Sequence, residues 1–155
     1  IQNNVRDDEL TPKDYYYLLL GQYAQTSRLI DSSSNRGLVV ADTNSLVTKA
    51  YYDYYLKESP VQDEETDTFD NLFASILSKE KWDLILFAEP VGAYINDSFR
   101  DMSMADEAIR SDFSSYLKRL KEECLAHIPT VYLANSYLDN YQAAKEAIDM
   151  IYQAD

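Results

Sequence analysis

The sequence predicts an α/β fold in which helices cover both faces of a parallel sheet. Short apolar runs alternate along the chain with longer segments whose apolar residues recur at helical spacing. Within each short run the apolar residues are continuous, which is typical of strands buried on both faces of a parallel sheet. With 155 residues, the chain is expected to form a single domain.

The elements follow in a regular order. Residues 1–10 show no period and are expected to be irregular, whereas Thr11-Pro12-Lys13-Asp14 has the N-cap, first-position proline and acidic first turn of a helix. Four of the predicted helices are Pro12–Ile30, Ser45–Lys57, Ala105–Ala126 and Tyr137–Gln153. A further helix, between the second and third of these, is expected to be capped by Thr66 or Asp67 and to carry the apolar residues Phe69, Leu72, Phe73, Ile76 and Leu77. The predicted strands are Leu38–Ala41, Trp82–Ala88 and Pro129–Ala134.

The composition excludes several classes of partner and site. Lys and Arg number 14 against 27 Asp and Glu, a net charge of -13, so nucleic acid and anionic membranes would be repelled. One cysteine permits no internal disulfide and no cysteine-based zinc site, and one histidine permits no histidine-rich metal site. Because no apolar run approaches about 18 residues and no signal peptide pattern opens the chain, we expect a cytoplasmic protein without a membrane partner.

Polar residues follow two of the predicted strands. Asp42-Thr43-Asn44 follows Leu38–Ala41, and Glu89-Pro90 follows the next strand. Ligands of open parallel sheets bind beyond the carboxyl ends of the strands, and a carboxylate placed there can hold Mg²⁺ or act on an acceptor hydroxyl. For Asp42 the alternative is a helix N-cap. The pattern itself leaves both interpretations open.

A connection of about 17 residues, Glu89–Ala105, follows the second predicted strand, and long connections in compact domains are often functional. It contains Asp97 and Arg100, and Arg110 lies just beyond it. Arginines there would suit a lid that closes on phosphates. The alternative is a segment of surface salt bridges. The chain has no G-x-x-x-x-G-K-S/T phosphate loop, so by itself it lacks the usual means of binding a nucleoside triphosphate.

The order of these motifs resembles the ribosylnicotinamide kinase domain of NadR-type NAD-biosynthesis proteins. The resemblance extends from about Asp7 to Tyr152 and rests mainly on the stretches GLVVADTNSLVT and DLILFAEPVGAYINDSFR. Members of this family are P-loop kinases whose phosphate loop follows an earlier strand. The resemblance therefore implies a partial P-loop nucleoside-kinase-like fold, the C-terminal portion of a kinase domain whose first strand and phosphate loop precede Ile1.

The resemblance also implies roles for individual residues. Asp42 would act on Mg²⁺ or on the acceptor hydroxyl, and Arg100 and Arg110 would be lid arginines that meet phosphates. The substrate side would be formed by Pro90, Tyr94 and Asp97. The sequence departs from the family pattern at Asn44, where a second Asp is common, and at Ser98, where Gly is common.

The function implied by the resemblance is ATP- and Mg²⁺-dependent phosphorylation of the 5′-hydroxyl of nicotinamide riboside, carried out by the complete protein and not by the fragment alone. Two alternatives stay open: a non-catalytic acidic interaction or regulatory module of P-loop-like fold, and a kinase for another small nucleoside. The expected partner is a small-molecule nucleoside. Loss of a central strand would also expose an apolar sheet edge, through which copies of the chain could form a homo-oligomer.

Overall fold

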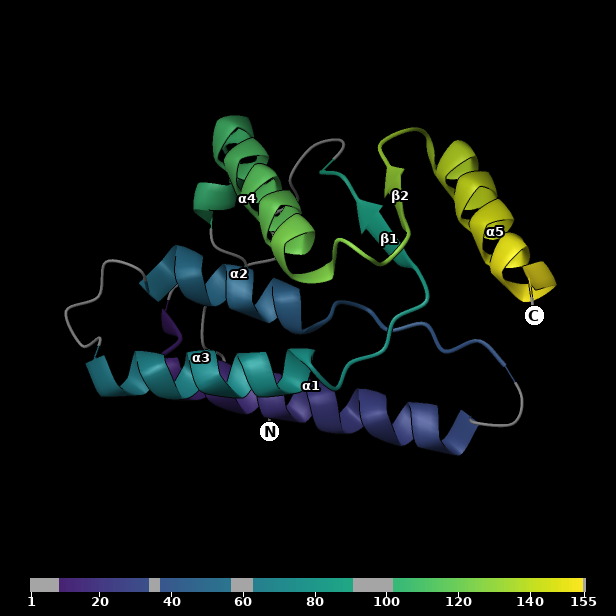
Figure 1. Ribbon diagram of the computed structural model, residues 1–155. Coiled ribbons are helices and arrows are strands. Elements are labelled where there is room, and N and C mark those ends of the chain that lie inside the picture. The colour runs from purple at the N-terminus through teal and green to yellow at the C-terminus, as the bar shows by residue number, and fades with distance from the viewer. Residues whose placement is uncertain (1–8, 34–36, 57–62, 91–101, 155) are drawn as a thin grey trace. The chain divides into compact units, whose positions relative to one another are not determined.

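The computed structural model of the protein describes residues 9–33, 37–56, 63–90 and 102–154. Its described residues up to Glu80 form one compact unit, here called the helical unit, and those from Lys81 onward form a second, the strand unit. The predicted single domain stays a prediction. The helical unit contains α1 (Pro12–Ser33), α2 (Ser45–Leu56) and α3 (Asp63–Leu77); the strand unit contains β1 (Ile85–Ala88), the 3-10 helix η2 (Met102–Ala105), α4 (Glu107–Leu125), β2 (Thr130–Leu133) and α5 (Tyr137–Ala154) (Figure 1).

Helix α1 begins where the sequence predicts. The backbone N–H of Asp14 donates to the Thr11 carbonyl at 3.0 Å and to its hydroxyl at 3.3 Å. In return, the Asp14 carboxylate accepts from the Thr11 N–H at 2.8 Å and from its hydroxyl at 2.6 Å. This reciprocal cap, with an acid at the third helical position, resembles a capping box and pairs donors that the helix start would otherwise leave unpaired.

We expect Thr11→Ala to destabilise α1 by about 1 kcal/mol, a typical cost of losing a helix N-cap. Hydrogen bonds from the Thr11 hydroxyl and N–H lower the pKa of the Asp14 carboxyl. A carboxyl with a lowered pKa adds stability above its unfolded-state pKa, and this contribution is lost as the pH falls through the folded-state value. An NMR titration should show the Asp14 pKa rising toward its ordinary value in Thr11→Ala, and an unchanged pKa would contradict the cap.

The core of the helical unit is aromatic and joins its three helices. Tyr52 of α2 stacks on Phe69 of α3 with ring centroids 3.9 Å apart. The same Tyr52 ring meets Tyr15 of α1 edge-on, with centroids 5.7 Å apart. Aromatic pairs in these geometries stabilise a core beyond the area they bury. Other buried apolar side chains of this unit are Leu19, Leu46, Ala50, Phe73 and Ile76.

A charged network also joins α2 to α3. Lys49 forms ion pairs with Asp53, one turn further along α2, and with Asp70 of α3 at 3.2 Å. Burial acts to lower the pKa of Lys49, but its hydrogen bonds and charge interactions with Asp53 and Asp70 outweigh burial and raise the pKa. The two helices are therefore connected by ion pairs as well as by ring stacking.

Helix α3 carries the predicted apolar stripe but begins earlier than predicted. Its buried residues Phe69, Phe73 and Ile76 confirm the helical spacing. The predicted cap at Thr66 or Asp67 is wrong, because the helix already starts at Asp63, inside the segment expected to be an acidic loop. The sequence Asp-Glu-Glu at its start is of the kind that the positive end of the helix dipole favours.

The predicted strand Leu38–Ala41 is wrong for the described structure. Residues 37–41 have no regular secondary structure, and Leu38 and Val40 are 55% and 69% exposed. A strand requires a hydrogen-bonded neighbour, and in the described part of the chain the two strands present pair with each other. The apolar side chains of Leu38 and Val40 are therefore exposed and are not buried in a sheet.

The strand unit confirms the parallel pairing. Strands β1 and β2 pair from Ile85 opposite Thr130 to Ala88 opposite Leu133. Strand β1 begins at Ile85, so the predicted start at Trp82 is too early. The described residues are thus mostly helical with a small two-stranded parallel sheet, and a sheet with helices on both faces is not shown.

Both predicted helices of the strand unit are confirmed. Helix α4 is capped by Asp106, whose carboxylate accepts from the N–H groups of Ala108 and Ile109 at 2.8 and 3.4 Å. Of the long predicted connection before it, residues 102–105 form η2, whereas residues 91–101 lie outside the described residues. No helix in the described part is long and apolar enough to cross a membrane.

Candidate functional site

The segment Asp42-Thr43-Asn44, here called the Asp42 turn, has an unusual backbone conformation. Thr43 has a φ of 66°, in the left-handed region that glycine adopts easily and β-branched residues rarely adopt. Such a residue costs on the order of 1–3 kcal/mol and persists only when its surroundings hold it. The turn immediately precedes α2. Because Asp42 belongs to this turn, the conformation of the turn determines the direction of the Asp42 side chain.

Gln22 of α1 contacts the Asp42 turn with its side-chain amide. The amide lies 2.8 Å from the Thr43 hydroxyl and 3.0 Å from the Thr48 hydroxyl. The oxygen and nitrogen of an amide are assigned from their hydrogen-bond network. With the oxygen facing the turn, Gln22 also accepts from the Asn44 N–H at 3.2 Å and donates to the Asn44 carbonyl at 3.3 Å. We adopt this orientation because it pairs the Asn44 N–H and gives the Asn44 carbonyl a second donor beside the Val47 N–H.

The carboxylate of Asp42 is exposed, and no described residue hydrogen-bonds or ion-pairs with it. The alternative interpretation of Asp42 as the N-cap of α2 is therefore wrong. Helix α2 begins at Ser45, whose hydroxyl donates to Glu80 at 2.6 Å, and the Asn44 carbonyl accepts from the Val47 N–H at 3.1 Å. Among the described residues, Asp42 therefore has an exposed side chain whose carboxylate is not engaged in a hydrogen bond or ion pair.

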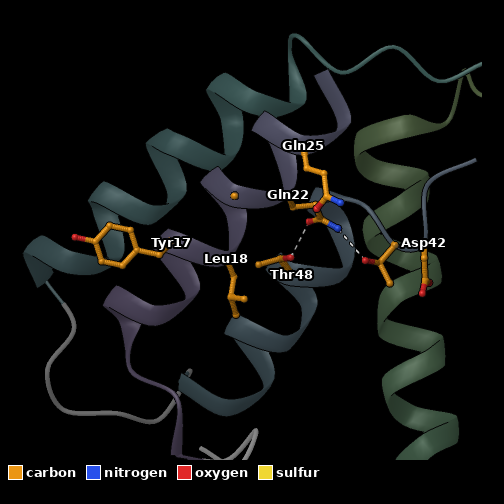
Figure 2. A pocket seen from close by; sticks show the side chains of 8 residues that line it. Tyr17, Leu18, Gln22, Gln25, Asp42 and Thr48 are labelled. Atoms are coloured by element: carbon orange, nitrogen blue, oxygen red, sulfur yellow. Dashed lines mark hydrogen bonds between the residues drawn. The ribbon is translucent and has the colours of Figure 1, made fainter. Parts of the chain in front are cut away.

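The Asp42 turn borders a hollow of about 460 Å³. Figure 2 shows Asp42 at one end of this hollow, Tyr17 at the other, and Gln22 between them. A Cβ at Gly21 would meet no atom within 4 Å, so this glycine of α1 leaves the hollow open and is not required by close packing. The lining residues are Tyr17, Leu18, Gly21, Gln22, Gln25, Asp42, Thr43 and Thr48.

Glu89 and Pro90, at the end of β1, lie in the strand unit. The Glu89 carboxylate forms an ion pair with Lys118 of α4 and accepts a hydrogen bond from the Ser114 hydroxyl at 3.1 Å. The Lys118 ammonium also lies 5.7 Å from the ring centre of Phe87 and 5.5 Å from that of Tyr132. Glu89 therefore has a structural role in joining α4 to the strands, whereas Pro90 is exposed.

We expect Lys118→Met to destabilise the strand unit by about 1–3 kcal/mol, because it leaves a largely buried carboxylate without its cation. The Glu89 side chain is 17% exposed. Methionine retains an apolar chain over Phe87 and Tyr132, so the measured effect reports the loss of the positive charge and not the loss of packing. Urea denaturation measures the effect. The double variant Lys118→Met, Glu89→Gln should regain part of the loss, and the absence of any recovery would contradict the pairing.

Arg110 is held by backbone carbonyls at the start of α4. Its Nη1 donates to the carbonyls of Met104 and Ala105 at 2.8 and 2.7 Å. These bonds connect α4 to η2, so Arg110 has a structural role in the described conformation, and its predicted contact with phosphates stays a prediction. Tyr94, Asp97 and Arg100 lie outside the described residues. Of the predicted site residues that are described, Asp42 belongs to the helical unit, and Pro90 and Arg110 to the strand unit.

The fit of Mg²⁺ to this site depends on Asp42. In the described part of the chain no three His, Cys, Asp or Glu residues are grouped as a metal site. In nucleotide-dependent enzymes Mg²⁺ is usually bound by one or two carboxylates together with substrate phosphates. A single exposed carboxylate fits that donor set and does not fit a site made of protein ligands alone.

Neither a protein-family model nor a curated protein sequence matches the chain. Among solved structures, the crystal structure of NadR protein in complex with NR is similar, with a TM-score of 0.75 and 34% sequence identity. The match covers 94% of this chain and 39% of that chain, so this chain spans well under half of the NadR protein. The resemblance to NadR-type proteins that the sequence predicts is therefore confirmed over the part of NadR that this chain spans.

Proposed function

We propose that the chain acts in nicotinamide riboside metabolism, as part of an ATP-dependent kinase that phosphorylates the 5′-hydroxyl of this nucleoside. The observation that carries the proposal is the exposed Asp42 on a strained turn, whose carboxylate has no hydrogen bond or ion pair with any described residue. The similarity to NadR protein in complex with NR, which we take as nicotinamide riboside, supports the choice of substrate. Because the match spans 39% of NadR, the activity is proposed for the complete protein.

In this proposal the protein contributes mainly position and charge, as is usual for phosphoryl transfer. Asp42 would accept a hydrogen bond from the acceptor hydroxyl and orient it toward the transferred phosphoryl group, or would hold Mg²⁺ beside it. When bound, Mg²⁺ would neutralise charge on the phosphates of ATP. Tyr94, Asp97 and Pro90 would contact the nucleoside, and Arg100 and Arg110 would reach phosphates when a lid closes.

The proposal includes a phosphate loop upstream of Ile1, on a strand that completes a parallel sheet with helices on both faces. The exposure of Leu38 and Val40 supports it, because an exposed apolar segment with no strand beside it in the described part of the chain is suited to pair with a further strand. The chain itself has no phosphate loop. We therefore expect the fragment alone to be inactive.

The experiment is a phosphorylation assay with the complete gene product that contains this chain, with ATP, Mg²⁺ and a panel of nucleosides. The proposal predicts that nicotinamide riboside is converted to its 5′-phosphate with the highest kcat/KM of the panel. A higher kcat/KM for another nucleoside would show that the substrate is wrongly assigned and that the kinase activity is correct. Absence of phosphorylation of every nucleoside would contradict the proposal and favour the non-catalytic interaction or regulatory module.

A further inference from the structure

We propose that Gln22 is a positioning residue for Asp42. It belongs to α1, 21 residues before Thr43 in the sequence, and reaches the Asp42 turn with both atoms of its amide. The inference rests on the proposed function, because Asp42 is the residue assigned there to the acceptor hydroxyl or its Mg²⁺. Gln22 itself would touch neither substrate nor metal.

The contacts of Gln22 involve the strained residue Thr43 and residues that follow it in the chain. The Gln22 amide meets the Thr43 hydroxyl, both backbone groups of Asn44 and the Thr48 hydroxyl of α2. Thr43 adopts a φ of 66°, which is unfavourable for a β-branched residue without external support. Gln22 therefore supplies hydrogen bonds that stabilise the turn in this conformation relative to relaxed alternatives.

The position of Asp42 depends on the turn because its side chain has no hydrogen bond or ion pair in the described part of the chain. A carboxylate that is neither hydrogen-bonded nor ion-paired is oriented by the backbone that carries it. Loss of the Gln22 contacts would let Thr43 return to a relaxed conformation and would move Asp42. Gln25, which also lines the hollow, has no hydrogen bond within the described part, so its place in the hollow alone does not give it this role.

The kinetic test uses the complete protein with Gln22→Ala and Gln22→Glu. We expect Gln22→Ala to lower kcat by about 10–100-fold, as a displaced catalytic group does. We expect its KM for nicotinamide riboside to stay within about threefold of the wild type, because binding is not removed. Gln22→Glu keeps an acceptor for the Asn44 N–H but cannot donate to the Asn44 carbonyl, so its loss should be smaller. Asn71→Ala, which removes an exposed amide from α3, is the matched control and should leave kcat unchanged.

A double-mutant cycle separates positioning from a general structural effect. If Gln22 acts through Asp42, Gln22→Ala should cause no further loss of kcat in a protein that already carries Asp42→Asn. An equal loss in both backgrounds, an unchanged kcat in Gln22→Ala, or a rise in KM alone would overturn the inference.

Hydrogen–deuterium exchange tests the inference independently of the activity. We expect faster exchange of the Asn44 amide in Gln22→Ala than in the wild type, with the exchange of α3 unchanged. Unchanged exchange at Asn44 would overturn the positioning role. If the wild type phosphorylates no nucleoside while Asn44 loses protection in Gln22→Ala, the proposed function fails and the structural role of Gln22 on the turn stands.

Discussion

Asp42→Asn is expected to lower kcat for phosphorylation of nicotinamide riboside by about 10²–10⁴-fold, the range for loss of a positioned acid or base. Asparagine has nearly the shape of aspartate but carries no charge, so it can neither accept the proton of the acceptor hydroxyl nor attract Mg²⁺. KM should change much less, because the interaction is strongest in the transition state. Steady-state kinetics on the complete protein measure both constants.

The matched control for this prediction is Asp67→Asn. Asp67 is an exposed carboxylate on α3 with no described hydrogen bond, so its replacement changes the net charge equally and should leave kcat unchanged. The melting temperature of Asp42→Asn should equal that of the wild type, because Asp42 is exposed and has no hydrogen bond or ion pair in the described part of the chain. A variant that melts normally and retains its kcat would show that Asp42 has no part in the reaction.

Phe69→Ala is expected to destabilise the helical unit by about 3–5 kcal/mol, the usual cost of removing a buried aromatic ring. Phe69 is 1% exposed, and its ring stacks on Tyr52 at 3.9 Å, which in turn packs on Tyr15. Because a domain is typically stable by about 5–15 kcal/mol, this loss would leave the unit marginal at 37 °C. Urea denaturation followed by tyrosine fluorescence or circular dichroism measures the change.

Two further variants serve as comparisons for the loss of stability in Phe69→Ala. Phe69→Leu refills part of the space and should cost less than Phe69→Ala. Asn71→Ala, at an exposed position on the same helix, should change the free energy of unfolding by no more than about 0.5 kcal/mol. A similar small effect for Phe69→Ala would contradict the position of Phe69 at the centre of the aromatic core.

The helices could be predicted from the sequence because their signals are local. The cap formed by Thr11 and Asp14 and the stripe of Phe69, Phe73 and Ile76 lie within one or a few helical turns. The strand predicted at Leu38–Ala41 is absent from the described structure, because an apolar run forms a strand only when another strand lies beside it. The early start of α3 was missed because an acidic run is compatible with both a solvated loop and a first helical turn.

The candidate site was predicted in part. The position of Asp42 after an apolar run identified it, and the structure excludes its alternative role as the cap of α2. No local pattern indicates a role for Gln22, because its contact with Thr43 joins residues 21 positions apart and depends on how α1 packs beside α2. Likewise, the ion pair of Glu89 with Lys118 brings together β1 and α4, and no local pattern indicates it.

Sequencing of the coding DNA upstream of Ile1 tests most directly the proposal that this chain is the distal part of a P-loop kinase. If the proposed function is right, an in-frame apolar strand precedes Ile1 and is followed by G-x-x-x-x-G-K-S/T within about 40 residues, the motif that binds the phosphates of ATP. An initiator codon close to Ile1 with no such motif before it would contradict the kinase and leave the interaction or regulatory module as the better account.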